Sequence, residues 1–471
     1  MKKKQLRWTL WTIASPFILF IILCILIYLP PIQNFLVDKA AVYASEATGM
    51  NISVGRISLS FPLNLVVTNV DAASPHNDTL LSVRRLQVNV QLLPLLKKQV
   101  EVDGISLQGA TVNSNDLIHG MRLNGTLGEL FISSHGVALD PETAIVNKVL
   151  LKDTDLSLCL NDTAAADTAA SDTTYWKIIL QDIDLQNVSF ALDMPLDSLS
   201  LAASLDNATL RDGLIDLHKS AYSLQTFRIK NGRVRYDSGR PSATASADSL
   251  SAGLDPSHIA LTDIGVKLDS LYYEGRNMKA IISQFVLKER SGVEIVSTEG
   301  RLVSNDKVLR VPSLKLETRD SYLELNAAMD WDALDFKKEG LVSARLMADI
   351  GKPDVVRFMG SMDEKFIRKY PSEPLRIRTG IDGDLNKLKL TTLTAELPGA
   401  LELFAKGELT SLTDSLLRGG DITLQAETKD LKFISTLAEG IEIPYGTRLE
   451  GKFTMAGPKM GTDLLLMQPE A

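Results

Sequence analysis

The sequence predicts a mainly β protein: an N-terminal transmembrane helix, then an elongated antiparallel β-sheet built from repeats, with a few short helices. Three observations predict this fold. A charge-free apolar run follows a basic N-terminus, apolar and polar residues alternate over most of the chain beyond residue 50, and one pattern of apolar positions recurs. Alternation with a period of two is typical of strands with one buried face. Repeats that contact only their neighbours give elongated structures.

Residues 1–7 form a basic cytoplasmic tail, and residues 8–29 carry no charge and are long enough to cross about 30 Å of hydrocarbon. Trp8 and Trp11 at one end and Tyr28 at the other suit the two membrane interfaces. The positive-inside rule places the rest of the chain outside the cytoplasm. A cleaved signal peptide is the alternative, but its apolar region is usually about 7 to 15 residues. We expect an uncleaved single-pass anchor.

The segment 30–48 has apolar residues at helical spacing and Gly49 as a stop. The positions on that face are Ile32, Phe35, Leu36, Lys39, Ala40 and Tyr43. We expect a short amphipathic helix at the outer membrane face; a plain connecting helix fits equally well.

Four stretches of the β region share one register, in which the apolar positions change parity after the fifth residue. That fifth residue is Gly109, Asp153, Asn187 or Asn231. Gly, Asn and Asp are the residues that best tolerate a left-handed backbone. The pattern predicts a bulge or tight turn at each of these positions, which would return the later apolar residues to the same face of the sheet.

We expect residues 49–350 to form the main β region, with a low-complexity polar insert at 161–174. The Asp-Thr-X triplets of the insert resemble an O-glycosylation signal, although a plain spacer is equally compatible. Residues 351–471 are expected to hold further helix-plus-strand units, with helices at 355–370 and 431–439. The chain ends soon after the second of these units opens, so we expect its C-terminal part to be truncated.

Composition and motifs exclude several functional classes. The 471 residues are 45% hydrophobic with a formal net charge of -8, and basic residues are scattered beyond the N-terminus. Nucleic-acid binding needs those residues on one face, so no nucleic-acid partner is expected. The five histidines and two cysteines have no metal-ligand spacing. We expect no catalytic residue, no metal and no cofactor, and hence no enzyme.

The region from Gly49 to Val112 carries an ordered set of features: Gly55 with Ile57, Phe61-Pro62, the Leu93-Pro94-Leu95-Leu96 break, and Asp103-Gly104-Ile105-x-Leu107. Behind a single N-terminal anchor, this order resembles the AsmA-like family, most closely its TamB branch. The resemblance covers about residues 5–457. It implies a long curled sheet, taco-like in cross-section, with an apolar inner groove that carries lipid across a Gram-negative periplasm from the inner membrane. It also implies an outer-membrane TamA-like barrel as partner, contacted through a C-terminal region that has no match in this chain.

An apolar strand face with no helix to cover it must be buried against something, and acyl chains serve as well as a second sheet, at about 25 cal/mol per Å² of apolar area. We therefore expect phospholipid in the groove, moving towards the outer membrane, with or without a role in outer-membrane protein assembly. The alternatives are a chaperone-like module that binds client strands and a closed β-sandwich receptor or adhesin domain. The candidate groove-lining residues are Leu86, Val88, Val90, Ile105, Leu107, Leu151, Ile183, Leu185, Phe227 and Ile229.

Overall fold

The computed structural model describes residues 33, 39, 41–43, 45–46, 48–60, 63–74, 78–91, 102–114, 120–138, 142–161, 175–239, 253–335, 338, 340–359, 364–384, 386–412, 415–436 and 444–468. The tail 1–7, the predicted span 8–29 with Trp8, Trp11 and Tyr28, and residues 162–174 of the polar insert lie outside this set. None of the helices in the described residues is both long enough and apolar enough to cross a membrane.

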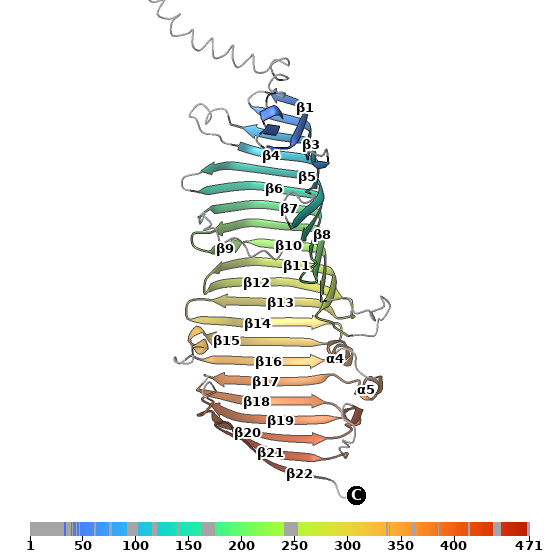
Figure 1. Cartoon of the computed structure of the whole chain (residues 1–471). Coiled ribbons are helices and arrows are strands. Elements are labelled where there is room, and N and C mark those ends of the chain that lie inside the picture. The colour runs from blue at the N-terminus through green and yellow to red at the C-terminus, as the bar shows by residue number, and fades with distance from the viewer. Residues whose placement is uncertain are drawn as a thin grey trace, which may run out of the picture. The chain divides into compact units, whose positions relative to one another are not determined.

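The described strands form a 22-stranded sheet, so the prediction of a mainly β chain with few helices is confirmed (Figure 1). The chain divides into two compact units, residues 1–208 and 209–471. Unit 1 holds β1 (Asn51–Ser60), β2 (Asn64–Ala73), β3 (Thr79–Val90), β4 (Val102–Asn113), β5 (Met121–Ala138), β6 (Thr143–Leu160) and β7 (Lys177–Met194), and β8 (Leu199–Asp216) crosses into unit 2.

Unit 2 continues the succession of strands, with a few helical turns at strand ends. Its strands are β9 (Ala221–Leu224), β10 (Thr226–Ser238), β11 (His258–Glu274), β12 (Asn277–Glu289), β13 (Glu294–Ser304), β14 (Val308–Thr318), β15 (Tyr322–Asp330), β16 (Val342–Ile350), β17 (Leu375–Gly383), β18 (Lys387–Leu397), β19 (Leu401–Thr410), β20 (Gly419–Thr428), β21 (Arg448–Ala456) and β22 (Lys459–Met467). Its helices are η1 (Trp331–Leu334), α4 (Lys352–Phe358), α5 (Glu364–Lys369) and η2 (Ile434–Thr436).

One strand pair departs from the predicted antiparallel sheet. Strands β1 to β6 pair antiparallel in chain order, but β6 and β7 run parallel. Residues 161–176 connect the end of β6 to the start of β7, and a connection of a dozen or more residues can return the chain to the same end of the sheet. Because the strands are parallel, Val149 lies opposite Ile183 and Leu151 opposite Leu185, which are matching positions of the predicted repeat.

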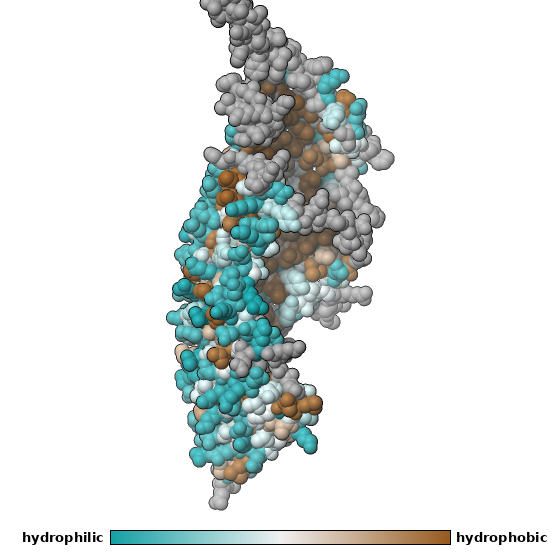
Figure 2. Space-filling model, turned by 90° about the vertical axis from the view of Figure 1, so that its left-hand side faces the viewer, coloured by the Kyte–Doolittle hydropathy of each residue, from teal (hydrophilic) through white to brown (hydrophobic). Residues whose placement is uncertain are grey.

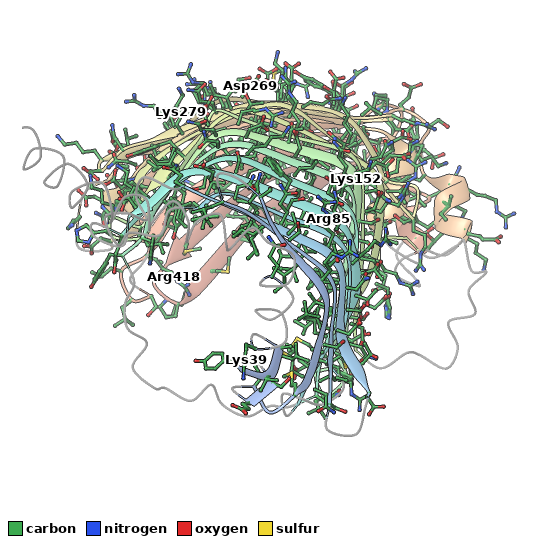
Figure 3. All side chains as sticks on the ribbon, turned by 90° about the horizontal axis from the view of Figure 1, so that it is seen from above. Lys39, Arg85, Lys152, Asp269, Lys279 and Arg418 are labelled. Carbon is green, nitrogen blue, oxygen red and sulfur yellow. The ribbon has the colours of Figure 1, made fainter. Side chains whose placement is uncertain are left out.

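The left-handed positions predicted from the repeat are confirmed. Backbone φ is +63° at Gly109, +49° at Asp153, +50° at Asn187 and +51° at Asn231. The Asn187 side-chain amide donates to the Asp153 carboxylate at 2.9 Å, so the two left-handed residues of β6 and β7 support each other. Seen from above, the blue and teal strands of unit 1 turn sharply partway along their length (Figure 3).

Three further left-handed positions occupy strand interiors: Asn69 in β2, Asp212 in β8 and Asp263 in β11. In unit 1, Asn69 lies across from Gly55, where an added Cβ would come within 3.0 Å of the Asn69 Cβ. Gly55 therefore leaves room for the bend in the neighbouring strand. The bend is a feature of adjacent strands rather than of one.

The short segment before β1 covers the outer edge of that strand. The described residues between 33 and 48 are helical, and the helix ends at Gly49, whose φ is +69°. The Gln33 side-chain amide donates to the Leu59 carbonyl at 3.1 Å, and the Ser45 hydroxyl accepts from the Ile52 backbone N–H at 3.0 Å. Polar side chains thus satisfy part of an edge that would otherwise be free to pair with another chain. Tyr43, on the predicted apolar face, is 74% exposed.

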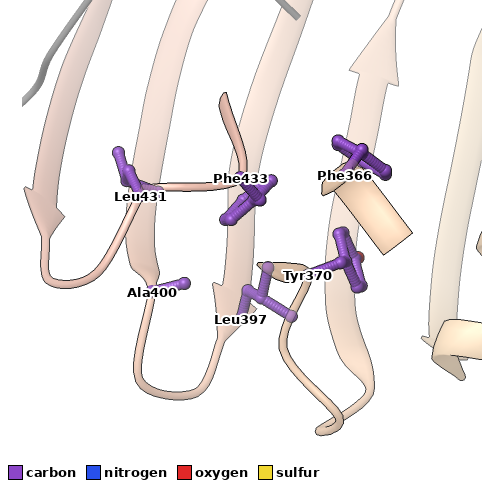
Figure 4. Close-up of a cluster of buried hydrophobic side chains, with 6 residues drawn as sticks. All are labelled: Phe366, Tyr370, Leu397, Ala400, Leu431 and Phe433. Atoms are coloured by element: carbon purple, nitrogen blue, oxygen red, sulfur yellow. The ribbon is translucent and has the colours of Figure 1, made fainter. Parts of the chain in front are cut away.

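A cluster of buried apolar side chains in unit 2 lies at the ends of its strands, not on their faces (Figure 4). Phe366 and Tyr370, at α5, pack against Phe433, with ring centroids 5.8 and 5.2 Å from the Phe433 ring. Leu397, Ala400 and Leu431 complete the cluster. These short helical segments cover the ends of β17 to β20 and leave the faces of the strands uncovered.

The predicted helices of this region are shorter than expected. The segment 355–370 forms two helices, α4 and α5, and within the described part of 431–439 only η2 is helical. Before η2 the Asp430 carboxylate accepts from the Lys432 backbone N–H at 3.1 Å, a local turn that competes with a longer helix. In α4 the fully buried Asp354 accepts from Arg357 at 3.0 Å and from the Ser321 hydroxyl at 2.6 Å, which fixes α4 to the β14–β15 hairpin.

The bend gives a test of backbone geometry. Replacing Asn187 by Val puts a β-branched residue at φ +50° and is expected to lower the free energy of unfolding by about 1–3 kcal/mol. Asn187→Gly should cost less than about 1 kcal/mol, because Gly adopts this conformation without strain. Denaturant unfolding of the full chain measures both. Gln186→Val, at an ordinary strand position beside it, is the control; equal losses for the Val and Gly variants of Asn187 would contradict the strain argument.

Candidate apolar groove

Two uninterrupted rows of apolar side chains cross all seven strands of unit 1 on one side of the bend. In each row, a residue of one strand lies directly opposite its neighbour in the next. The leucine row consists of Ile57, Val67, Leu86, Leu107, Leu130, Leu151 and Leu185. The isoleucine row consists of Leu59, Leu65, Val88, Ile105, Ile132, Val149 and Ile183. Directly opposite side chains are close enough to pack along the row.

The structure brings most of the predicted groove residues into these rows. The leucine row contains Leu86, Leu107, Leu151 and Leu185, and the isoleucine row contains Val88, Ile105 and Ile183. Val90 lies at the end of β3, opposite Val102. Phe227 and Ile229 lie in unit 2, opposite Leu268 and Val266 of β11.

Sequence reasoning missed three residues of the leucine row and four of the isoleucine row. The missed members of the two rows are Ile57, Leu59, Leu65, Val67, Leu130, Ile132 and Val149. The same alternation that identified Leu107 is present at Leu130 and Ile132, so counting alternation over every strand would have found them.

Every side chain of both rows is half-buried, and none is fully buried. The described strands all belong to one sheet, so no second sheet of the described chain packs on the rows. Figure 2 shows brown apolar side chains lining a hollow at the height of β1 to β7. In a two-layer domain such a face would be closed by the opposite layer. Here the described residues leave an open apolar trough.

The apolar face continues beyond the bend. The next row consists of Val54, Val70, Val83, Ala110, Leu127, Thr154 and Val188. Thr154 is only 2% exposed, and its hydroxyl donates to the Lys152 carbonyl at 3.2 Å. This internal hydrogen bond keeps the hydroxyl from presenting an unsatisfied group to the trough.

The opposite face of unit 1 carries a polar row next to the bend. This row lies between the apolar rows and the bend, its side chains are on the other face of the sheet, and it carries charges of both signs. It consists of Arg56, Thr68, Arg85, Gln108, Glu129, Lys152 and Gln186. Arg85 and Lys152 of this row are marked in Figure 3. Leu107 and Gln108, or Leu185 and Gln186, are therefore adjacent residues on opposite faces.

Unit 2 has apolar rows of its own. The longest consists of Leu316, Leu323, Ala348, Ile377, Ala395, Leu403, Ala426, Leu449 and Leu466, one residue from each strand between β14 and β22. The polar side of this unit carries ion pairs: Lys288 Nζ lies 2.8 Å from the Asp263 carboxylate, and this hydrogen bond lowers the pKa of Asp263 and raises the pKa of Lys288. Both side chains are about half exposed, so water screens the pair and its contribution to stability is small.

A separate hollow of about 600 Å³ lies over β18 to β21 in unit 2. Three of its acidic lining residues are paired: Glu396 with Arg376 at 3.4 Å, Glu402 with Lys429 at 2.8 Å, and Glu427 with Arg448 at 3.4 Å. Paired charges hold the sheet surface together and leave little unsatisfied potential for a ligand. In the described part of the chain, no group of three or more His, Cys, Asp or Glu residues is placed to hold a metal ion. The apolar trough is therefore the feature that needs a functional explanation.

Comparison with known proteins gives no further guide: no family model matches this chain, and no curated protein matches it.

The openness of the trough can be tested by truncation. Leu107 is half-buried on an uncovered face, so Leu107→Ala is expected to cost less than about 1.5 kcal/mol of unfolding free energy. Leu397, 3% exposed in the closed cluster of unit 2, is the comparison, and Leu397→Ala should cost about 2–5 kcal/mol. Denaturant unfolding of both variants decides. A loss at Leu107 as large as at Leu397 would mean that protein closes the face, as in a sandwich.

Proposed function

We propose that this chain is a membrane-anchored lipid conduit of the AsmA-like family, related to TamB, in which the trough of unit 1 holds the acyl chains of phospholipid. The observation that carries the proposal is the pair of unbroken apolar rows across β1 to β7, half-buried and without a second layer among the described residues. The function is transport without catalysis: the trough offers a surface, and no reacting group is needed.

The energetics favour an apolar occupant of the trough. Removing apolar surface from water contributes about 25 cal/mol per Å², or about 0.8 kcal/mol for each CH₂ group. A lipid tail laid along the rows buries both its own surface and the exposed part of side chains such as Leu107 and Leu130. The zwitterionic or anionic head of the lipid would stay in water at the open side, since burying a charge without a partner is costly.

The proposed setting is the inner membrane of a Gram-negative bacterium. The basic tail 1–7 and the charge-free run 8–29 support an anchor with its N-terminus in the cytoplasm. The sheet would then lie in the periplasm and move phospholipid towards the outer membrane. The resemblance to the AsmA-like family also suggests a partner at the outer membrane, and we propose a TamA-like barrel in that role.

Photocrosslinking in intact cells tests the conduit. A photoreactive residue at Leu107 or Leu185 should attach phospholipid, because both lie in the leucine row. The adjacent Gln108 and Gln186, on the polar face, are matched controls and should attach none. Label at the Gln positions equal to that at the Leu positions, or no lipid at any of the four, would contradict a lipid path on the apolar face.

A charge in the row gives a second readout of the same proposal. Leu185→Asp should remove most of the phospholipid that co-purifies with the full chain, whereas Gln186→Asp should leave it in place, because only the former puts a carboxylate against acyl chains. Circular dichroism confirms that both variants fold. Unchanged lipid content in Leu185→Asp would refute the conduit.

A second function, capture of client β-strands, is favoured by one observation. Strand β22 is hydrogen-bonded to β21 alone among the described strands, and all nine of its residues are exposed. A strand that is paired on one side can add a further strand through main-chain hydrogen bonds, supplied by another protein or by a continuation of this chain. Client strands could bind here while lipid occupies the trough of unit 1.

Crosslinking also tests strand capture. A photoreactive residue at Leu465, 57% exposed in β22, should attach outer-membrane proteins if the edge receives client strands. The control is Leu424 in β20, which is paired on both sides, by β19 and β21. Protein adducts at both positions, or at neither, would remove the support for this second function.

A further inference from the structure

Two loops of unit 2 meet at one end of its C-terminal strands. The loop between β19 and β20 and the turn between β21 and β22 are joined by two hydrogen bonds. The Gly457 backbone N–H donates to the Arg418 carbonyl at 2.7 Å, and Arg418 Nε donates to the Gly457 carbonyl at 3.0 Å. Gly457 has φ +58°, and a Cβ there would come within 2.8 Å of the Leu416 carbonyl oxygen. The close approach requires Gly, so the two loops hold each other in place.

This junction exposes three large apolar side chains, which we call the apolar tip. Leu416 is 75% exposed, Leu417 71% and Met460 75%. Figure 2 shows a brown patch projecting at the height of the C-terminal strands, on the side that faces the viewer. Single exposed leucines are ordinary on protein surfaces, but a cluster held on rigid turns marks an interaction surface.

Basic residues flank the apolar tip. Arg418 follows Leu417 directly, and Lys459 precedes Met460. Within the strands next to the tip, Asp421 is paired with Lys452 at 3.1 Å, so that carboxylate already has a cation. The tip therefore combines apolar side chains with neighbouring cations, the chemistry of segments that insert shallowly into lipid headgroups.

We propose that the apolar tip inserts into the surface of a bilayer that contains anionic lipid. The charge pattern favours lipid, because the exposed Lys459 and the half-buried Arg418 adjoin the exposed apolar side chains and can attract lipid phosphate while the leucines enter the acyl boundary. A protein partner would need a matching pocket, and the tip is convex. The inference goes beyond the proposed conduit and does not depend on it, since the tip lies wholly in unit 2 and would bind a membrane even if unit 1 carried no lipid.

The test uses the full chain held in a phosphatidylcholine nanodisc, with Cys24 and Cys159 replaced by Ala and a single new cysteine labelled with an environment-sensitive fluorophore. With Leu417→Cys, adding phosphatidylglycerol-containing vesicles should shift the emission to the blue. The control is Leu196→Cys, an exposed turn position of unit 1 (62% exposed) that precedes Asp197 rather than a cation. Its emission should not change.

Vesicle binding is then measured by sedimentation. Replacing both leucines, Leu416→Asp with Leu417→Asp, should weaken co-sedimentation of the nanodisc-held chain at least about tenfold. Lys459→Gln should weaken it on phosphatidylglycerol vesicles but not on phosphatidylcholine alone, and added salt should have the same effect. Because lipid content of the trough is not part of this readout, failure here leaves the conduit untouched, and failure of the conduit leaves this result intact.

Two outcomes would overturn the proposal. One is an unchanged emission at position 417 on adding vesicles. The other is a blue shift that depends on protein concentration without vesicles, which would assign the apolar tip to contact between copies of the chain.

Discussion

The continuity of the apolar face depends on left-handed residues at the bend, which unit 1 has in β2, β4, β6 and β7. Side chains alternate between the two faces of a strand, so any uncompensated change of parity moves every later residue to the wrong side. The backbone at Asp153 and Asn187, with φ +49° and +50°, absorbs one residue and returns Leu156 and Phe190 to the face that carries Leu151 and Leu185. Without this change of parity, the rows beyond the bend would lie on the opposite face of the sheet.

The same constraint explains why a single layer suffices. Matching positions of neighbouring strands stack into rows, so each leucine packs against two others along the row and reaches half-burial without a second sheet. The part of each row residue that stays exposed can contact lipid in a conduit, whereas a two-layer domain would bury it under the second layer. Within unit 2, closed apolar packing lies at the strand ends near Phe366 and Phe433. In unit 1, Gln33 and Ser45 hydrogen-bond to the outer edge of β1.

The positions of four left-handed residues could be predicted from the local sequence. Gly109, Asp153, Asn187 and Asn231 could be assigned a left-handed backbone because a parity change in the apolar pattern coincides with a residue type that tolerates it. The same signal was available at Asn69, between Val67 and Val70, where the parity also changes.

What could not be predicted depends on contacts distant in sequence. The parallel pairing of β6 and β7 is one such case, since the connection 161–176 is long enough for either direction and alternation is the same in both. The contact between the loops at Arg418 and Gly457 is a second case, because no local sequence pattern indicates which turns lie next to each other in space.

The uniformity of the rows bears on how a lipid could move. Strands lie about 4.8 Å apart, so an acyl chain that advances by one strand exchanges contact with one apolar side chain for contact with the next. From Leu107 to Leu130 to Leu151 the exchange is between identical residues, and the binding free energy changes little at each step. A surface without a pronounced minimum in binding free energy binds lipid along its whole length and does not hold it at any single position. Such a surface sets no direction by itself, so the direction of net transport must come from what lies at its two ends.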